Sequence, residues 1–229
     1  MTTVLLVRHG LTAMTGPVLA GWTPGVHLDD RGKAQAVSLA ERLLPVPVSA
    51  IIASPLERCQ ETAAALATGR DVAVTTDDRL GECHYGDWTG QELKKLAKDP
   101  LWKVVQAHPS AARFPGGEAL RDTQARAVNA VREHNASLGD DATWIAVSHG
   151  DVIKALVADA LGMHLDMFQR VQVDPCSLTV VRYTSLRPFV IRLNDVAGAI
   201  DDLLPPKRRG GRRRPASSDA PVGGGAGAA

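Results

Sequence analysis

The chain has 229 residues and a mass of 24.3 kDa, and its 45% hydrophobic and 22% charged residues are close to globular averages. This composition excludes a collagen-like, coiled-coil or fully disordered chain. The formal net charge of +1 divides unevenly, because residues 205–229 carry +5 and residues 1–204 carry −4. The three cysteines form no CxxC pair, so neither a zinc ribbon nor a disulfide framework is expected.

Short apolar runs alternate with helical patterns along the chain. Buried strands are predicted at 4–7, 50–53, 72–74 and 144–147, and helices at 30–43, 54–66, 120–138 and 152–161. In the second helix, Ser54 is the expected N-cap and Pro55 the first helical residue. Two closing strands, 177–183 and 189–193, are predicted to form a hairpin.

Strand–helix alternation favours an α/β fold with a mostly parallel central sheet and helices on both faces. The segment from about Gly81 to Gly117 breaks this pattern, and we expect it to form loops and short helices above one edge of the sheet. No apolar periodicity follows residue 204. We therefore predict one catalytic domain, residues 1–204, and a disordered basic tail rich in Pro, Arg, Gly and Ala, residues 205–229.

The sequence contains no stretch of transmembrane length, and its N-terminal apolar run is too short for a signal peptide. A cytoplasmic location is expected, which agrees with the odd number of cysteines. The basic cluster at 207–214 could bind nucleic acid, acidic lipid or a partner protein. Because the tail has no aromatic residue for base stacking, we prefer a solvated tail, with neither a membrane nor a nucleic acid as partner.

Two predicted strands end in a histidine followed by a glycine. The first strand leads into RHG at 8–10, and the strand at 144–147 leads into SHG at 148–150. Because the carboxyl ends of parallel strands meet at one edge of a sheet, His9 and His149 are expected to converge. Glycine at such a junction lets the backbone and a substrate approach closely.

Two arginines are expected at the same edge. Arg8 precedes His9, and Arg58 lies in the first turn of the helix that follows the second strand. Helix N-termini favour anions, and an arginine fork matches the oxygens of a phosphate group. The sequence therefore predicts a site for a phosphate dianion.

A phosphate site needs a nucleophile and a proton donor to perform chemistry. His9 can attack phosphorus with one neutral ring nitrogen if the other nitrogen donates to a carbonyl group. Glu82 is the leading candidate for the proton donor, and Glu118 and Asp151 are alternatives that could share this work. Asp151 also suits the start of a helix, where the dipole favours a negative charge.

Four blocks in the sequence carry a resemblance to a known family: RHG at 8–10, SPLERCQETA at 54–63, LGECHYGDWTG at 80–90 and VSHGDVIKAL at 147–156. In this order and spacing they resemble the histidine phosphatase (phosphoglycerate-mutase-like) superfamily over about residues 4–193. The sequence is also similar to actinobacterial proteins labelled phosphomutases.

This resemblance implies a phosphoglycerate-mutase-like three-layer sandwich. It also implies that His9 accepts the phosphoryl group, that Arg8, Arg58 and His149 bind phosphate, and that Glu82 is the acid. The phosphatase branch implies no metal and no organic cofactor. Family analogy further suggests a homodimer.

The chain departs from the family pattern around the substrate. Thr15 stands where the family often has an asparagine that helps to hold phosphate. The candidate substrate contacts are Thr15, Gly21, His84 and Gly150, although His84 equally suits an ordinary surface loop.

Three functions remain open on sequence grounds. Cys83 replaces an arginine that mutases use to grip a second phosphate, and residues 114–118 resemble a phosphatase loop. We therefore favour a metal-independent phosphatase that hydrolyses small-molecule phosphomonoesters through a phosphohistidine on His9. A phosphoglycerate-type phosphomutase is the alternative, and a non-catalytic phospho-ligand binder is the second.

Overall fold

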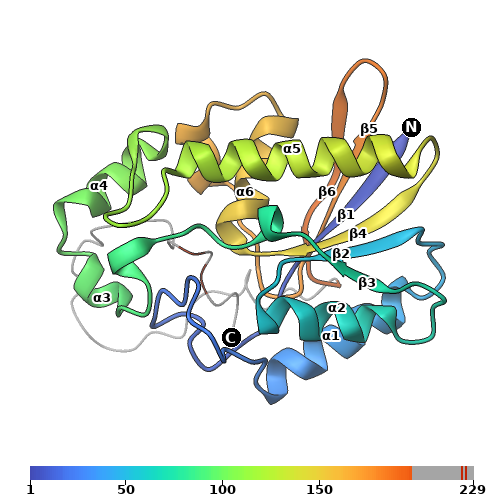
Figure 1. Cartoon of the computed structure of the whole chain (residues 1–229), viewed down its shortest axis with the longest axis horizontal. Helices are drawn as coiled ribbons and strands as arrows, with labels where there is room; N and C mark the ends of the chain where they lie inside the picture. Colours follow the sequence, from blue (N-terminus) through green and yellow to red (C-terminus); the bar gives the residue numbers. More distant parts are fainter. Residues whose placement is uncertain (198–222, 224, 226–229) are drawn as a thin grey trace, which may run out of the picture.

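A six-stranded sheet forms the centre of the computed structural model, which describes residues 1–197, 223 and 225 (Figure 1). The strand order is β3-β2-β4-β1-β5-β6. The first four strands in this order pair in parallel, and β5 and β6 add an antiparallel hairpin. The strands are β1 Thr2–Arg8, β2 Ala50–Ala53, β3 Val74–Thr76, β4 Thr143–Ser148, β5 Leu178–Tyr183 and β6 Pro188–Asp195. The predicted α/β fold with a mostly parallel sheet is confirmed.

Helices cover both faces of this sheet (Figure 1). α1 Asp30–Leu43 and α2 Glu57–Ala67 lie on one face, and α5 Leu120–Leu138 and α6 Gly150–Ala160 lie on the other. The short helices α3 Leu93–Leu96 and α4 Pro100–Ala107 lie beside the sheet, within the segment predicted to hold loops and short helices. The molecule is thus the three-layer sandwich that the sequence predicts.

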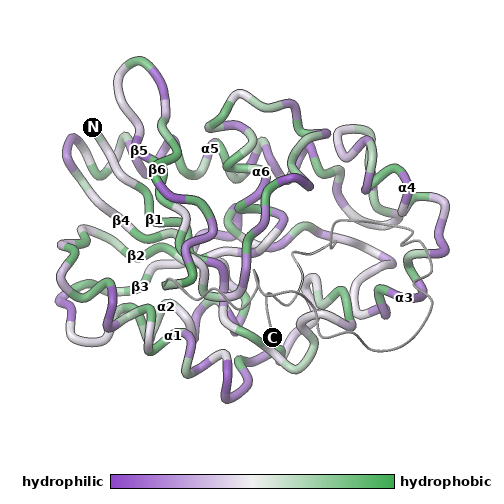
Figure 2. Tube along the Cα trace, turned by 180° about the vertical axis from the view of Figure 1, so that it is seen from behind, coloured by the Kyte–Doolittle hydropathy of each residue, from purple (hydrophilic) through white to green (hydrophobic). Residues whose placement is uncertain are grey.

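β1 shows why these layers form. Its side chains alternate between two hydrophobic clusters, with Val4 and Leu6 packed under α5 and α6, and Leu5 and Val7 packed under α1 and α2. A strand that is buried on both faces needs a continuous apolar run, which is what residues 4–7 provide. Figure 2 shows the hydrophobic residues running along the central strands.

Two predicted elements, β3 and α2, begin later than expected, and several other boundaries differ by one or two residues. β3 comprises Val74–Thr76 and not 72–74, since its hydrogen bonds follow the register of β2. α2 begins at Glu57, and the residue before it, Leu56, makes no side-chain capping bond. Ser54 is not the residue before α2; its hydroxyl group lies 2.7 Å from Nε2 of the buried His149 and also accepts a hydrogen bond from the Leu56 amide at 3.4 Å.

The predicted domain end at residue 204 lies outside the described residues, as does the predicted tail, 205–229, except for Gly223 and Gly225. The helices of the described part are all too short or too polar to cross a membrane.

Tight backbone packing holds the loop after β1 against α1. A Cβ atom on Gly32 would lie 2.0 Å from the carbonyl oxygen of Leu11. We therefore expect Gly32→Ala to push away the loop that carries His9 and to lower the free energy of unfolding by about 1–3 kcal/mol. Urea denaturation measures this effect. Ser38→Ala, on the exposed side of α1, is the control and should change the free energy of unfolding by less than about 0.5 kcal/mol. Equal effects of Gly32→Ala and Ser38→Ala would contradict the packing argument.

Candidate active site

Three adjacent strands bring the predicted residues to one edge of the sheet. Arg8 ends β1 and His9 follows it, Arg58 lies in the first turn of α2 just after β2, and His149 lies between β4 and α6. Each of these four side chains is buried, with at most 5% exposed. The structure therefore brings the two arginines and the two histidines together, as expected from the strand ends.

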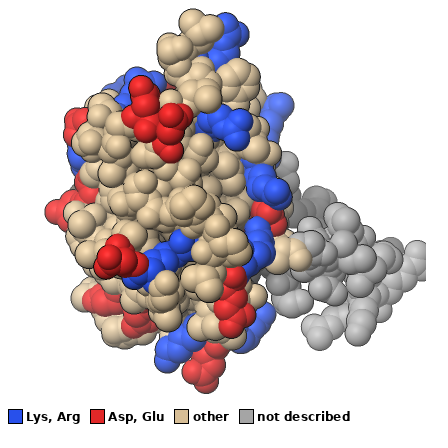
Figure 3. Space-filling model, turned by 90° about the vertical axis from the view of Figure 1, so that its right-hand side faces the viewer, with Lys and Arg blue, Asp and Glu red and all other residues tan. Residues whose placement is uncertain are grey.

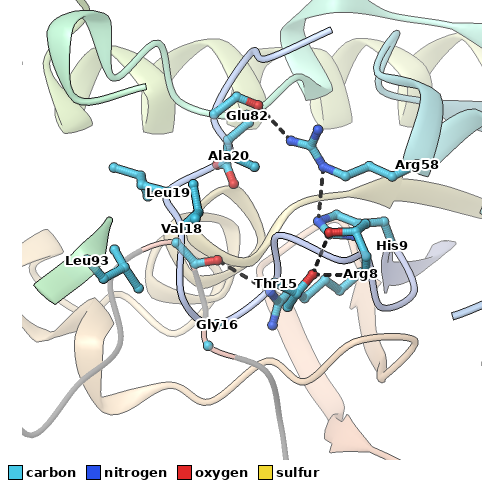
Figure 4. A pocket seen from close by; sticks show the side chains of 14 residues that line it. Arg8, His9, Thr15, Gly16, Val18, Leu19, Ala20, Arg58, Glu82 and Leu93 are labelled. Atoms are coloured by element: carbon cyan, nitrogen blue, oxygen red, sulfur yellow. Dashed lines mark hydrogen bonds between the residues drawn. The ribbon is translucent and has the colours of Figure 1, made fainter. Parts of the chain in front are cut away.

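His9 is held in one tautomer. Its Nδ1 lies 2.8 Å from the carbonyl oxygen of Gly10, which can only accept a hydrogen bond, so Nδ1 carries the proton. Nε2 is then unprotonated and accepts a hydrogen bond from Nε of Arg58 at 3.3 Å (Figure 4). Burial, and after it the charges of Arg58 and Arg8, hold the pKa of His9 well below its usual value. The result is a neutral imidazole with a lone pair on Nε2, as a nucleophile requires.

His149 lies beside His9, with ring centroids 5.2 Å apart. Its Nδ1 accepts a hydrogen bond from Nη2 of Arg58 at 3.3 Å, so Nε2 carries the proton and donates to Oγ of Ser54 at 2.7 Å. Burial and the charge of Arg58 hold the pKa of His149 well below its usual value. Ser54 is a site residue that the sequence analysis missed, although its place directly after β2 at the same sheet edge was a usable signal.

Arg58 links these groups. Besides contacting both histidines, it donates from Nη2 to the carbonyl oxygen of Gly21 at 2.7 Å. Its Nη1 is buried and has no hydrogen-bond partner in the described part of the chain. A buried donor without a partner costs free energy, and a phosphate oxygen is well suited to satisfy a guanidinium donor.

A cavity opens beside His9 (Figure 4). Its wall is formed by Arg8, Arg58, Glu82 and Leu93, by eight residues of the stretch 9–21, and by Gly223 and Gly225. Two of the predicted substrate contacts, Thr15 and Gly21, are lining residues. The Thr15 hydroxyl group is held by Thr12, with 2.9 Å between the two Oγ1 atoms.

The other two predicted contacts are not lining residues. His84 is exposed and stacks on Trp22, with ring centroids 4.2 Å apart. Gly150 is buried as the first residue of α6. His149 is also absent from the cavity wall, and it reaches the site through Arg58 and Glu82.

Glu82 enters the site from the segment after β3. Its Oε1 accepts a hydrogen bond from the Cys83 amide at 2.9 Å, and its Oε2 lies 3.9 Å from Nδ1 of His149. Burial, followed by the negative charge of Asp151, raises the pKa of Glu82 to about 7. A carboxyl group that exchanges its proton near neutral pH can serve as an acid and then as a base.

Glu118, the first alternative donor, is committed to other partners. It forms an ion pair with Arg126, with 2.6 Å between Nη2 and Oε1, and it accepts a hydrogen bond from the His84 amide. Burial alone would raise the pKa of Glu118, but these hydrogen bonds hold it below its usual value. Glu118 is therefore ionised under conditions in which Glu82 still holds a proton.

Comparison with known proteins decides the family. Residues 4–196 match the model of the histidine phosphatase superfamily (branch 1). The chain belongs to this superfamily. One similar protein is phosphoserine phosphatase 1 of Hydrogenobacter thermophilus, 30% identical over 200 residues, which cover 85% of this chain and 92% of that protein. Another is 2,3-bisphosphoglycerate-dependent phosphoglycerate mutase 2 of Gloeobacter violaceus, 30% identical over 183 residues, or 77% of this chain and 83% of that protein.

A solved structure is similar to this chain over most of the length of both chains. The structure of a mycobacterial glucosyl-3-phosphoglycerate phosphatase in complex with VO3 gives a TM-score of 0.75 at 28% identity, covering 84% of this chain and 98% of that one. The superfamily thus contains both phosphatases and phosphoglycerate mutases among the relatives of this chain. Membership of the chain in this superfamily supports phosphoryl transfer as its chemistry, and both phosphatase and mutase activity are compatible with that membership.

The charge on the surface of this chain differs from the charge of the candidate site. On the face seen in Figure 3, positive and negative side chains are interspersed. Residues 1–204 carry a net charge of −4, and the two arginines of the cavity wall, Arg8 and Arg58, are buried. Within residues 1–197, 223 and 225, no three His, Cys, Asp or Glu side chains form a cluster that could hold a metal ion.

Proposed function

We propose that this histidine phosphatase hydrolyses small-molecule phosphomonoesters through a phosphohistidine on His9, with Glu82 as the proton donor. The observation that carries the proposal is the lone pair on His9 Nε2, which lies beside an arginine with an unsatisfied buried donor. A nucleophile and an anion-binding group are thereby adjacent. The partner we propose is a small phosphorylated substrate in the cytoplasm.

In the first step, Arg8 and Arg58 hold the oxygens of the substrate phosphate. The lone pair of His9 Nε2 attacks phosphorus, and the bond between phosphorus and the ester oxygen breaks. The leaving oxygen takes the proton of Glu82 and departs as an alcohol. Phosphohistidine and an ionised Glu82 remain.

In the second step, the Glu82 carboxylate takes a proton from a water molecule whose oxygen attacks phosphorus. The bond between nitrogen and phosphorus breaks, and its electron pair returns to His9 Nε2. Inorganic phosphate leaves, and Glu82 is again protonated. A pKa of about 7 allows both transfers near neutral pH.

The distribution of positive charge supports hydrolysis over mutase activity. A mutase must hold two phosphate groups, yet Arg8 and Arg58 are the basic side chains of the described cavity wall. Cys83, which stands in place of the mutase arginine, is fully buried in an apolar cluster with Trp88 and Phe114. It therefore adds no positive charge for a second phosphate.

The test is phosphate release from an aryl phosphate by the purified full-length chain with a metal chelator present. Labelled substrate and an alkaline quench should leave radioactive phosphate on the protein, because phosphohistidine is stable to base. Absence of both phosphate release and label would overturn the proposal.

The mutase alternative has one favourable observation, the similarity to a phosphoglycerate mutase. Its test supplies 3-phosphoglycerate with a bisphosphate primer and compares the rate of isomerisation with the rate of phosphate release. Isomerisation faster than hydrolysis would replace the phosphatase proposal.

A further inference from the structure

Arg126 of α5 binds the backbone that leads to Glu82. Its Nη1 donates to the carbonyl oxygens of Arg79 and Gly81 at 2.7 and 2.9 Å, and its Nη2 donates to the carbonyl oxygen of Glu82 at 2.9 Å. Its Nε and Nη2 also donate to the two carboxylate oxygens of Glu118. These five hydrogen bonds use all five N–H groups of a guanidinium. Arg126 is therefore held in one orientation against the segment that carries the candidate acid.

The carbonyl oxygen of Glu82 and the amide of Cys83 belong to one planar peptide group. The carbonyl oxygen accepts hydrogen bonds from Nη2 of Arg126 and from Nε1 of Trp22, the second at 2.6 Å. The amide at the other end of the group donates to Oε1 of Glu82 at 2.9 Å. Because the group is planar, holding its carbonyl oxygen also fixes the direction in which the Cys83 amide points. Arg126 is thus connected to the Glu82 carboxyl group through one rigid unit.

The Glu82 carboxyl group depends on this support for its direction. Its Oε1 is bound by the Cys83 amide, whereas its Oε2 lies 3.9 Å from Nδ1 of His149, which is beyond hydrogen-bond distance. Glu82 lines the cavity beside His9, where a leaving oxygen would have to receive its proton. Proton transfer requires the carboxyl group to lie within hydrogen-bond distance of that oxygen. A change in the direction of the Cys83 amide would turn the carboxyl group and slow the transfer.

We propose that Arg126 is a positioning residue, which holds the peptide group between Glu82 and Cys83 and thereby directs the carboxyl group that donates the proton. This inference rests on the proposed role of Glu82. Arg126 is not among the lining residues of the described cavity, so it acts through Glu82 and not on the substrate. Trp22 supports the same carbonyl oxygen from the opposite partner segment of the chain. Loss of Arg126 should therefore slow proton donation and spare the attack by His9.

The test variant is Arg126→Lys in the full-length chain. Lysine keeps the positive charge beside Glu118, but it has three N–H donors in place of five and no planar fork. We expect the rate of phosphohistidine formation to fall about tenfold or more with an alkyl phosphate, whose leaving oxygen needs a proton. With an aryl phosphate, whose leaving group needs none, the rate should fall less than about threefold. Labelled substrates and a rapid alkaline quench give both rates.

A double variant shows whether Arg126 acts through Glu82. In a Glu82→Gln background the proton donor is already absent, so Arg126→Lys should change the ratio of the alkyl and aryl rates by less than about twofold. Arg132→Lys is the matched control, because Arg132 lies on the same helix and pairs with Asp159 at 3.2 Å. It should keep both wild-type rates. Glu118→Gln retains an acceptor oxygen for Arg126 and leaves the three carbonyl contacts in place, so it should not reproduce the loss.

Equal losses with the two substrates would show a merely structural role for Arg126 and would overturn the inference. So would the absence of any loss in a folded Arg126→Lys variant, or a further change of the ratio in the double variant. If Arg126→Lys does not fold, Trp22→Phe decides, because it removes the other donor to the Glu82 carbonyl oxygen and should show the same preferential loss with the alkyl phosphate. Failure of the proposed function is seen separately, as a Glu82→Gln variant without leaving-group dependence or a wild type that forms no phosphohistidine.

Discussion

Replacing His9 with alanine is expected to reduce phosphate release by about 10⁴-fold or more, the scale of loss seen when a nucleophile is removed. Nδ1 of His9 is committed to the Gly10 carbonyl oxygen, so Nε2 is the nitrogen with a lone pair to attack phosphorus. Without it no covalent intermediate can form. Initial rates with an aryl phosphate measure the loss, and the alkaline-quenched variant should carry no labelled phosphate.

Two further variants separate chemistry from folding. His9→Gln keeps a polar side chain near Arg58. We expect it to lose as much activity as His9→Ala, but to have a melting temperature closer to that of the wild type. His84→Ala removes an exposed histidine that stacks on Trp22, and it should retain nearly full activity. Activity of His9→Gln within tenfold of the wild type would rule out His9 as the nucleophile.

The fold was predictable because its periodicities are strong. Residues 4–7 and 144–147 are continuous apolar runs, and the helix at 120–138 was predicted to its last residue. The errors fall where distant segments decide the structure. β3 takes its limits from pairing with β2, and Ser54, the expected N-cap of α2, contacts His149, which lies far away in the sequence.

The site was predictable to the extent that strand ends determine it. Arg8, His9, Arg58 and His149 could be placed at one edge from topology alone. The details depend on side-chain geometry that spacing does not contain. The roles of Ser54 and of Tyr85 as hydrogen-bond partners come from contacts across 95 and 66 residues of sequence.

Replacing Glu82 with glutamine should make activity depend steeply on the leaving group. An alkyl phosphate needs a proton on its leaving oxygen, so its rate should fall by about 10²–10⁴-fold. The aryl oxide of an aryl phosphate leaves as a stable anion without a proton, so the rate of the phosphorylation step with an aryl phosphate should fall much less. Rates of phosphohistidine formation, measured with labelled alkyl and aryl phosphates in a rapid alkaline quench, give the two losses.

The pH dependence identifies the acid, because the environment of Glu82 sets where its proton is lost. Its pKa is raised from 4.5 to about 7, so Glu82 is protonated below about pH 7 and ionised above it. For an alkyl phosphate, kcat/KM of the wild type should therefore fall as the pH rises through about 7. The ratio of the kcat/KM values of the wild type and Glu82→Gln cancels the ionisation of the substrate, and this ratio should fall in the same pH range.

Glu118→Gln, which alters a carboxylate held ionised by Arg126, should preserve the leaving-group dependence and the fall of kcat/KM above about pH 7 seen in the wild type. If Glu118→Gln and not Glu82→Gln removed this fall of kcat/KM, the proton donor would be Glu118.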